Sequence, residues 1–529
     1  MHHATISDYT SIGISNDDPD IVKGRAGSPY AVKDYYNVDP DLAENPLNRL
    51  QEFEALIERT HNIGLKVIID IVPNHIARHY EGKSNPKGVQ DFGANDNTKV
   101  AYSKNNNFYY VVGQNFKVPK WRDNYMPLGG EKHPLADGKF KEIPARWTGN
   151  GTRLAQPNAY DWYETVKINY GIKPDGTKDF DSLPRSYKSK DYTQHNAFWK
   201  GKELPDSWKK FKDIVLYWTA KGVDGFRFDM AEMVPVEFWS YLNSAIKEQN
   251  PDAFLLAEVY NPSLYRDYIY LGKMDYLYDK VAMYDTIKHI MQGHGLTDNL
   301  PKILNDLKDI EHNMLHFLEN HDEQRIASPE FAGLAEKGKP AMVVSTTISS
   351  SPTLLYFGQE VGETGKENAG FGKPSRTSLF DYIGVPHHQR WVNNMQFDGG
   401  QLSESETKLR NFYKQLLNFT IKSTALMGEY QEIHSYNREH TNNYNHRVFS
   451  FVRWSEDEKL IIVSNFDESS YSFNFKLPEN LISEWKLKDG SYMLADQLGK
   501  NKEILLKIKN GKGYLDINIK GLESFILKF

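Results

Sequence analysis

The stretch VDGFRFD, which runs from Val223 to Asp229, contains the pattern that decides the fold. Its β-branched and aromatic side chains are the types that strands favour, and the run has the length of a buried strand. Apolar residues at helical spacing precede it: Phe211, Ile214, Val215 and Trp218. Asp206 or Ser207 is expected to cap that helix, and Gly222 to end it. The pattern therefore predicts a helix followed by a strand that ends in an acid.

The same pattern recurs on both sides of this stretch. Residues 46–63 are expected to form a helix, and the almost continuous apolar run Leu65–Val72 follows as a strand buried on both faces. A helix over residues 236–248 leads to a strand at Phe254–Glu258. Three later strands are expected at residues 276–278, 315–318 and 353–357. Alternating helices and strands indicate βα units around a parallel sheet.

Polar or acidic residues stand where these strands end. They are Asp70, Asn74, His75, Asp229, Glu258, His321, Asp322, Gln359 and Glu360. A single acid at a strand end proves nothing, since most such acids are caps or members of ion pairs. Several strands that end this way indicate a site at the C-terminal face of a TIM-type (β/α)8 barrel, where the active sites of this fold lie.

Two segments interrupt the alternation. Residues 76–205 are rich in Asn, Gly, Lys and Tyr and are expected to form an inserted domain beside the site. Towards the C-terminus, short alternating strands such as Val448–Val452 and Leu460–Val463 predict an antiparallel β-sandwich. The expected division is 1–75 for the first part of the barrel, 76–205 for the inserted domain, 206–424 for the rest of the barrel and 425–529 for the sandwich.

Composition excludes several classes of protein and site. The 529 residues include 64 Lys and Arg against 70 Asp and Glu, a net charge of −6, so we expect no nucleic-acid partner. The absence of cysteine excludes disulfides, thiolate metal sites and cysteine catalysis. No apolar run approaches the ~20 residues of a membrane helix. Aromatic residues reach 13%, which suits a sugar-binding cleft, although most such rings belong to cores.

Six motifs stand in order along the chain: Gly27–Tyr36, Asp70–His75, Gly225–Asp229, Ala257–Val259, Phe317–Asp322 and Tyr356–Glu360. In this order they resemble the motifs of the α-amylase family of glycoside hydrolases. One such motif is weak evidence, whereas six in the family's order are specific. The resemblance covers nearly the whole chain. It implies a retaining glycosidase that cleaves α-glucosidic bonds in α-glucans, such as starch, or in maltooligosaccharides, so an oligo- or polysaccharide is the expected partner.

The resemblance assigns the reaction to two acids. Asp229 is expected to be the nucleophile and Glu258 the acid and base, and retaining enzymes hold such a pair ~5–5.5 Å apart. Neighbouring strands lie ~4.8 Å apart, which suits that separation. Arg227 is expected to face the same side of its strand as Asp229 and to keep it ionised. Nearby acids should raise the pKa of Glu258, so that it starts protonated.

Further roles follow from the same resemblance. Asp322 is expected to stabilise the transition state, His75 and His321 to bind sugar hydroxyls, and Tyr30 to stack under the sugar ring. Asn74 matches a family ligand of structural Ca²⁺, and an amide oxygen is a suitable donor for calcium. A purely structural hydrogen-bonding role for Asn74 stays open. No organic cofactor is expected, because proton transfer and covalent catalysis suffice.

The chain departs from the family pattern in three places. Met230–Met233 replaces the Lys and His that commonly follow the nucleophile, and Ile168–Tyr170 matches a Leu-Asn motif only loosely. The first 28 residues show no strand, and Ser15–Asp20 is expected to be a polar loop. The barrel is therefore expected to lack its first two strands, as in an N-terminally shortened chain. A signal peptide would be lost with that segment, so a secreted or periplasmic location stays open.

Other functions stay open beside the glycosidase. A transglycosylase or a sugar isomerase would use the same acids, and the products formed from maltooligosaccharides would separate them. A binding-only relative usually lacks a catalytic acid, whereas Asp229, Glu258 and Asp322 are all present. An inactive shortened chain is a further alternative. The sequence does not decide linkage, chain length, exo or endo attack, or oligomeric state.

Overall fold

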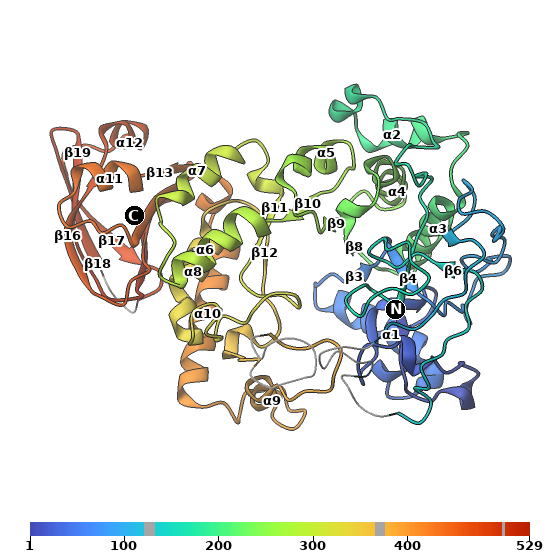
Figure 1. Cartoon of the computed structure of the whole chain (residues 1–529). Helices are drawn as coiled ribbons and strands as arrows, with labels where there is room; N and C mark the ends of the chain where they lie inside the picture. Colours follow the sequence, from blue (N-terminus) through green and yellow to red (C-terminus); the bar gives the residue numbers. More distant parts are fainter. Residues whose placement is uncertain (121–127, 129–132, 366–375, 500–502) are drawn as a thin grey trace. The chain divides into compact units, whose positions relative to one another are not determined.

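The structure is a computed structural model that describes residues 1–120, 128, 133–365, 376–499 and 503–529. These residues form two compact units, shown in Figure 1. The first unit contains Met1–Leu277 and Ser378–Tyr382, and the second contains the other described residues from Tyr278 on. The four-part division expected from the sequence stays a prediction. In the described part of the chain, no helix combines the length and apolar composition needed to cross a membrane.

Parallel strands form the centre of the first unit. In spatial order they are β3 (Ile68–Ile71), β8 (Gly225–Phe228), β9 (Phe254–Ala257) and the first two residues of β10 (Tyr276–Tyr278). The helices along this part of the chain are α1 (Arg49–Asn62), α3 (Asp206–Ala220), α4 (Val236–Gln249) and α5 (Tyr265–Tyr270). The predicted alternation of helices and parallel strands is confirmed.

The pleat of β8 explains why this segment is a strand. Phe226 and Phe228 point to one face, are fully buried, and place their rings 6.0 Å apart. Arg227 points to the other face, towards the acids at the strand ends. Gly225 is required because a Cβ at this position would lie 2.2 Å from the carbonyl oxygen of Phe254 on β9. The local sequence thus combines apolar packing with close approach of two strands.

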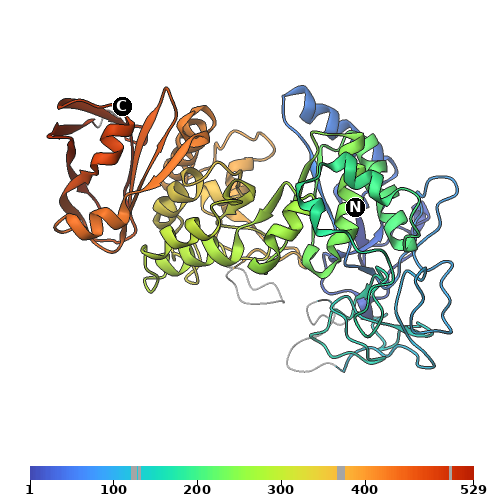
Figure 2. The same ribbon diagram turned by 90° about the horizontal axis from the view of Figure 1, so that it is seen from above.

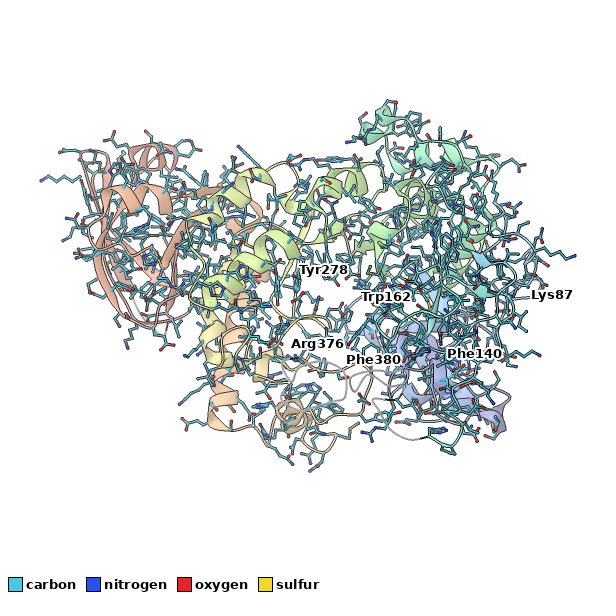
Figure 3. The ribbon with its side chains drawn as sticks, in the orientation of Figure 1. Lys87, Phe140, Trp162, Tyr278, Arg376 and Phe380 are labelled. Carbon is cyan, nitrogen blue, oxygen red and sulfur yellow. The ribbon has the colours of Figure 1, made fainter. Side chains whose placement is uncertain are left out.

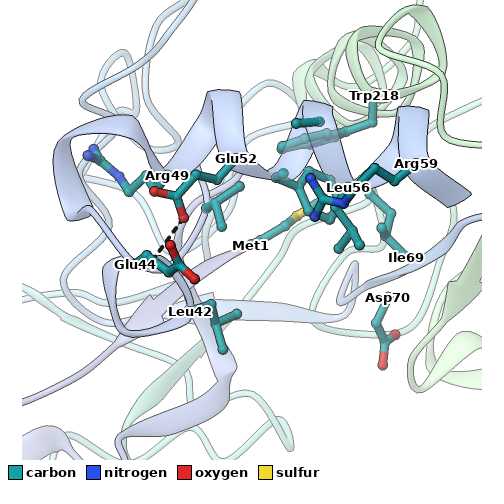
Figure 4. A pocket seen from close by; sticks show the side chains of 13 residues that line it. Met1, Leu42, Glu44, Arg49, Glu52, Leu56, Arg59, Ile69, Asp70 and Trp218 are labelled. Atoms are coloured by element: carbon teal, nitrogen blue, oxygen red, sulfur yellow. Dashed lines mark hydrogen bonds between the residues drawn. The ribbon is translucent and has the colours of Figure 1, made fainter. Parts of the chain in front are cut away.

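Two local expectations around these strands are wrong. Neither Asp206 nor Ser207 caps α3, because the helix begins at Asp206 after Pro205 and no side chain caps it. The run Leu65–Val72 is not buried on both faces, since Ile68 is 42% exposed. β3 is the end strand of its sheet among the described residues. A cavity of about 850 Å³, lined by Met1, Leu56, Ile69 and others, lies beside β3 and α1 (Figure 4).

The first residues contain a strand that the sequence did not indicate. β1 (His2–Ala4) pairs antiparallel with β2 (Ser28–Asp34), with irregular register. Half of the expected polar loop at Ser15–Asp20 is buried, namely Asp17, Pro19 and Asp20, and Lys33 Nζ lies 2.8 Å from Asp17 Oδ1. The polarity of a residue does not reveal whether it is buried as part of an ion pair.

The segment expected to be an inserted domain is mostly irregular. Its short strands pair as β4 (His75–Ala77) with β7 (Thr165–Lys167) and β5 (Tyr110–Val111) with β6 (Ala145–Arg146), both antiparallel. The helix α2 (Tyr192–Trp199) follows. Figure 2 shows the loops between β4 and α2 on one side of the first unit. The β4–β7 pair brings residues of this segment next to the end of β3.

The second unit begins with further βα elements. β11 (Met314–Phe317) pairs parallel with β12 (Thr353–Leu354), which is shorter than the predicted strand at 353–357. Asp279, just after β10, donates its N–H to Leu315 of β11 at 2.9 Å. The helices of this region are α6 (Asp285–Met291), α7 (Asn299–Asp306), α8 (Lys339–Thr347), α9 (Pro386–Val392) and α10 (Glu404–Lys422).

An antiparallel sheet completes the second unit. Its strands are β13 (Glu429–Glu432), β14 (Val448–Trp454), β15 (Lys459–Asn465), β16 (Tyr471–Leu477), β17 (Gly490–Asp496), β18 (Glu503–Lys509), β19 (Lys512–Ile519) and β20 (Ser524–Lys528), with α11 (His434–His440) and α12 (Glu479–Glu484) between them. The spatial order is β13-β14-β15-β20-β17-β18-β19-β16. One apolar core contains residues from nearly all of these strands. The predicted C-terminal antiparallel β domain and the β14–β15 hairpin are confirmed.

Candidate active site

Arg227 lies among three carboxyl groups in the first unit. Its Nη1 is 2.8 Å from Asp229 Oδ1 and 3.1 Å from Asp70 Oδ2, and its Nη2 is 3.3 Å from Glu258 Oε2. Arg227 and Asp229 face the same side because side chains alternate along a strand. The predicted contact between Arg227 and Asp229 is present, and Asp70 joins it.

Asp229 and Glu258 leave neighbouring strands at the same level. The N–H of Asp229 donates to Ile71 on β3 at 2.9 Å, and the N–H of Glu258 donates to Phe228 on β8 at 3.0 Å. Both acids are buried, at 6% and 5% exposure. The expectation that these two acids stand side by side at adjacent strand ends therefore agrees with the geometry.

The pKa values of Asp229 and Glu258 are shifted in opposite directions. Burial raises the pKa of Asp229 well above its ordinary value, with Arg227 opposing this effect. Burial also raises the pKa of Glu258, but Arg227, the N–H of Met230 and hydrogen bonds from Tyr260 and Asp229 outweigh it, so this pKa lies below its ordinary value. The two shifts therefore run opposite to the expected directions, and the roles of Glu258 as the acid and Asp229 as the nucleophile stay predictions.

Met230 contributes to the lowered pKa of Glu258. Its N–H donates to Glu258 Oε2 at 2.8 Å, and its φ of +46° places a side chain in the left-handed region. A non-glycine residue held in this conformation is strained, and such strain often accompanies functional sites. The sequence marked Met230 only as a departure from a family pattern, because the backbone conformation that aims its N–H cannot be read from residue type.

Tyr30 lies beside the same cluster. Its hydroxyl donates to Asp70 Oδ2 at 2.9 Å, and the Arg227 guanidinium is 5.9 Å from the centroid of its ring. The ring is half-buried. Its predicted role under a sugar ring stays a prediction, and its position next to Arg227 and Asp70 is compatible with that role.

His75 is enclosed by protein groups. It is 4% exposed, and its ring lies 5.2 Å from that of Trp162. Its Nδ1 faces Asn74 Nδ2 at 3.0 Å. Burial lowers the pKa of His75 to about 3, against a hydrogen bond to the main chain of Tyr30. His75 is therefore neutral and packed between protein partners, and its predicted contact with substrate stays a prediction.

Asn74, the expected calcium ligand, is saturated by protein groups. The residue is fully buried, and its Oδ1 accepts a hydrogen bond from Lys167 Nζ. Its Nδ2 donates to the carbonyl of Gly149 at 3.0 Å. Across the described residues, no group of three or more His, Cys, Asp or Glu side chains could hold a metal ion. The donors around Asn74 do not fit calcium, because a cationic group already occupies the amide oxygen.

His321 and Asp322 follow β11 in the second unit. His321 Nε2 is 3.2 Å from Asp322 Oδ2, and the Asp322 carboxyl group is half-exposed. Asn320 Oδ1 accepts the N–H of Asp322 at 2.9 Å. The side chain of Arg376 (Figure 3) donates to the main-chain carbonyl of Asp322 at 3.0 Å. These contacts fix the backbone and leave the Asp322 carboxylate accessible to a ligand.

Glu232 lies in the stretch that departs from the family pattern, and here it has a structural role. Its Oε2 accepts the N–H groups of Tyr260 and Asn261, both at 2.9 Å. It therefore connects the loop after β8 to the loop after β9. Asn169 of the loosely matched motif is also structural, since it is fully buried and its Nδ2 donates to the carbonyls of Ser103 and Asn106.

Two family models together match most of this chain. Residues 19–131 and 190–449 match the family model described as alpha amylase, catalytic domain. Residues 439–528 match the one described as alpha amylase, C-terminal all-beta domain. The chain is 23% identical over 513 residues to "Alpha-amylase 3" of Dictyoglomus thermophilum, which covers 90% of this chain and 80% of that protein. It spans only 37 to 62% of four further curated relatives.

Solved structures share the fold. The α-amylase of H. orenii superposes with a TM-score of 0.58 at 19% identity, over 95% of this chain and 88% of that one. AmyP, solved in complex with maltose, superposes with a TM-score of 0.55 at 17% identity, over 94% of this chain and 80% of that one. The predicted combination of a barrel-type catalytic domain and an all-β C-terminal domain is confirmed by these matches.

Proposed function

The chain belongs to the α-amylase family of glycoside hydrolases, and from this premise we propose that it hydrolyses α-glucosidic bonds in α-glucans or maltooligosaccharides with retention of configuration. The observation that carries the proposal is the position of Arg227 between Asp229 and Glu258. Two carboxyl groups at adjacent strand ends are what cleavage through an oxocarbenium-like transition state requires. Carbohydrate as the substrate class agrees with a relative solved in complex with maltose.

The reaction proceeds in two balanced steps. Asp229 attacks the anomeric carbon and forms a glycosyl ester while Glu258 gives its proton to the departing glycosidic oxygen. Glu258, now a carboxylate, then takes a proton from water, which attacks the ester and releases Asp229. The sugar product keeps its anomeric configuration because it is inverted twice.

Substrate binding has to prepare the two acids for the first step. In the free protein, burial raises the pKa of Asp229, whereas Arg227 and the N–H of Met230 keep the pKa of Glu258 below its ordinary value. Retaining chemistry uses a protonated acid and an ionised nucleophile ~5–5.5 Å apart. A sugar ring bound between the two carboxyl groups is proposed to favour the protonated form of Glu258. Asp229 then stays next to Arg227, whose charge stabilises the carboxylate.

The remaining assignments rest on the motif order. Asp322 stabilises the positive charge of the transition state, and His321 and Tyr30 contact the sugar. His75 is likewise proposed to bind a sugar hydroxyl, and in the free protein its ring lies between Asn74, Trp162 and the main chain of Tyr30. Transfer to a second sugar or isomerisation would use the same acids and would differ in the products.

Digestion of maltoheptaose by the purified chain tests the proposal. We expect shorter maltooligosaccharides by chromatography, and an α-anomeric product by proton NMR at early times. Glu258→Gln should lose at least about 10³-fold in kcat/KM, since the amide cannot donate the proton. The exposed Glu248 on α4 provides the matched control, Glu248→Gln. Wild-type cleavage by Glu258→Gln would refute the role assignment, longer products would indicate transfer, and binding without cleavage would indicate a binding-only relative.

A further inference from the structure

Lys167 joins three segments of the first unit. It is the last residue of β7, pairs with His75 of β4, and donates its N–H to Trp147 at 3.0 Å. Its side chain reaches across this pair, where Nζ donates to Asn74 Oδ1 and lies 3.4 Å from the carbonyl oxygen of Met233. Asn74 follows β3, and Met233 follows β8. We call the region of these contacts the seam.

The amide of Asn74 has a fixed orientation at this seam. An ammonium group only donates, so the side of the amide that faces Lys167 must be oxygen. A carbonyl only accepts, so the side that faces Gly149 at 3.0 Å must be the NH₂ group. The main-chain carbonyl of Asn74 accepts the N–H of Ile168 at 3.1 Å. The amide oxygen, the NH₂ group and the main-chain carbonyl of Asn74 therefore all have protein partners.

The two oxygens at Lys167 suit a monovalent ammonium better than calcium. Both are neutral, one from an amide and one from a peptide carbonyl. Calcium takes about 6–8 oxygen ligands, among them carboxylates that offset its charge. Within the part of the chain that the structure describes, Lys167 forms no ion pair with a carboxylate. A calcium ion here would meet two neutral oxygens and the positive charge of Lys167.

We propose that the ammonium group of Lys167 is the cation of the seam, and that it makes calcium unnecessary at the position where the family resemblance predicts this ion. A covalently attached cation holds the end of β3, the β4–β7 pair and the loop after β8 together. The seam is thereby kept next to His75 and the acid cluster without a metal. The proposal concerns stability and cation binding, so it stands or falls independently of the proposed substrate.

Thermal melting of the whole chain tests the proposal. Wild type should melt at the same temperature, within about 1 °C, in millimolar calcium and in excess EDTA, because a cation that does not bind adds no stability. Lys167→Met keeps the aliphatic stem and removes the charge, and should lower the melting temperature by about 2–4 °C. Lys173→Met, six residues further on at an exposed position, is the matched control and should melt like wild type.

Two results would overturn the proposal. One is a calcium-dependent rise in the wild-type melting temperature that disappears in Asn74→Ala, since this would place a calcium ion on the amide oxygen. The other is a melting temperature for Lys167→Met equal to that of Lys173→Met, since the ammonium would then contribute nothing. The first test uses wild type as its reference, so it remains decisive even if Lys167→Met folds poorly.

Discussion

Arg227 determines how charge is distributed in the acid cluster. One guanidinium faces Asp70, Asp229 and Glu258 at 2.8 to 3.3 Å. Its charge opposes the effect of burial on Asp229 and, together with the N–H of Met230, keeps the pKa of Glu258 below its ordinary value. The charge distribution of the pair Asp229 and Glu258 therefore depends on a main-chain donor as well as on charged side chains.

Asp229→Asn is expected to remove activity and to stabilise the protein. Burial raises the pKa of Asp229, so the folded state binds this proton more tightly than the unfolded state. The associated stability is complete below the unfolded pKa and is lost as the pH rises through the folded pKa. An amide side chain does not ionise, so the variant does not lose this stability as the pH rises. We expect the gain in melting temperature to be larger at about pH 8 than at about pH 5, with activity lower by about 10⁴-fold or more.

Calorimetry at the two pH values measures this effect. The exposed Asp252 after α4 supplies the control, and Asp252→Asn should leave the difference between the two pH values unchanged. A melting temperature for Asp229→Asn below that of wild type at the higher pH would contradict the raised pKa. The expected gain in melting temperature would be an example of the trade-off between stability and activity at an active site.

Sequence reasoning succeeds for residues whose placement follows from local geometry. Asp229 and Arg227 share one face because a strand alternates, and Glu258 ends the neighbouring strand in a βα alternation. Lys167 cannot be found this way, since it contacts Asn74 only because β4 and β7 pair across a long loop. Met230 is missed because its φ decides its role. Residue types alone do not predict long-range strand pairing or unusual backbone torsions.

Two strands of similar composition can differ in how deeply they are buried. Both β3 and β8 are short parallel strands rich in apolar residues. β8 has a strand on each side and is buried throughout, whereas β3 is the end strand among the described residues and leaves Ile68 42% exposed. A strand pattern predicts the element, but its burial depends on which neighbours cover it. The sequence therefore predicted β3 as a strand and misjudged its environment.

This contrast predicts unequal costs for truncation to alanine on the two strands. Phe226→Ala should cost about 3–5 kcal/mol, because the ring is fully buried and its removal leaves a cavity. Ile68→Ala should cost about 1 kcal/mol or less, since much of its side chain is already in contact with solvent. Thermal melting of the two variants against wild type gives the ranking. Equal losses would mean that the β3 edge is covered in solution.

The C-terminal sheet and the helices of the second unit form one body. Arg453 on β14 is buried and donates to the carbonyl oxygen of Ile348, just after α8, at 2.8 Å, and also to that of Leu426. Arg447 donates to the carbonyl oxygen of Ile290 in α6 at 2.7 Å. Composition alone suggests a boundary near residue 425, where short strands begin. The buried arginines cross that boundary, and no sequence pattern marks which arginines do so.

Arg453→Met is therefore expected to loosen the sheet and the α8 region together. It removes the donor to four carbonyls, those of Ile348, Ala425, Leu426 and Gly428, which should cost roughly 2–4 kcal/mol. Hydrogen exchange should accelerate both in α8, residues 339–347, and in β15, residues 459–465, because a shared interface opens as a cooperative unit. Lys507→Met, at an exposed position on β18 of the same sheet, removes a charge without a buried partner and should leave exchange unchanged. Faster exchange in β15 with an unchanged α8 would show instead that the sheet is an independent domain whose boundary follows the composition.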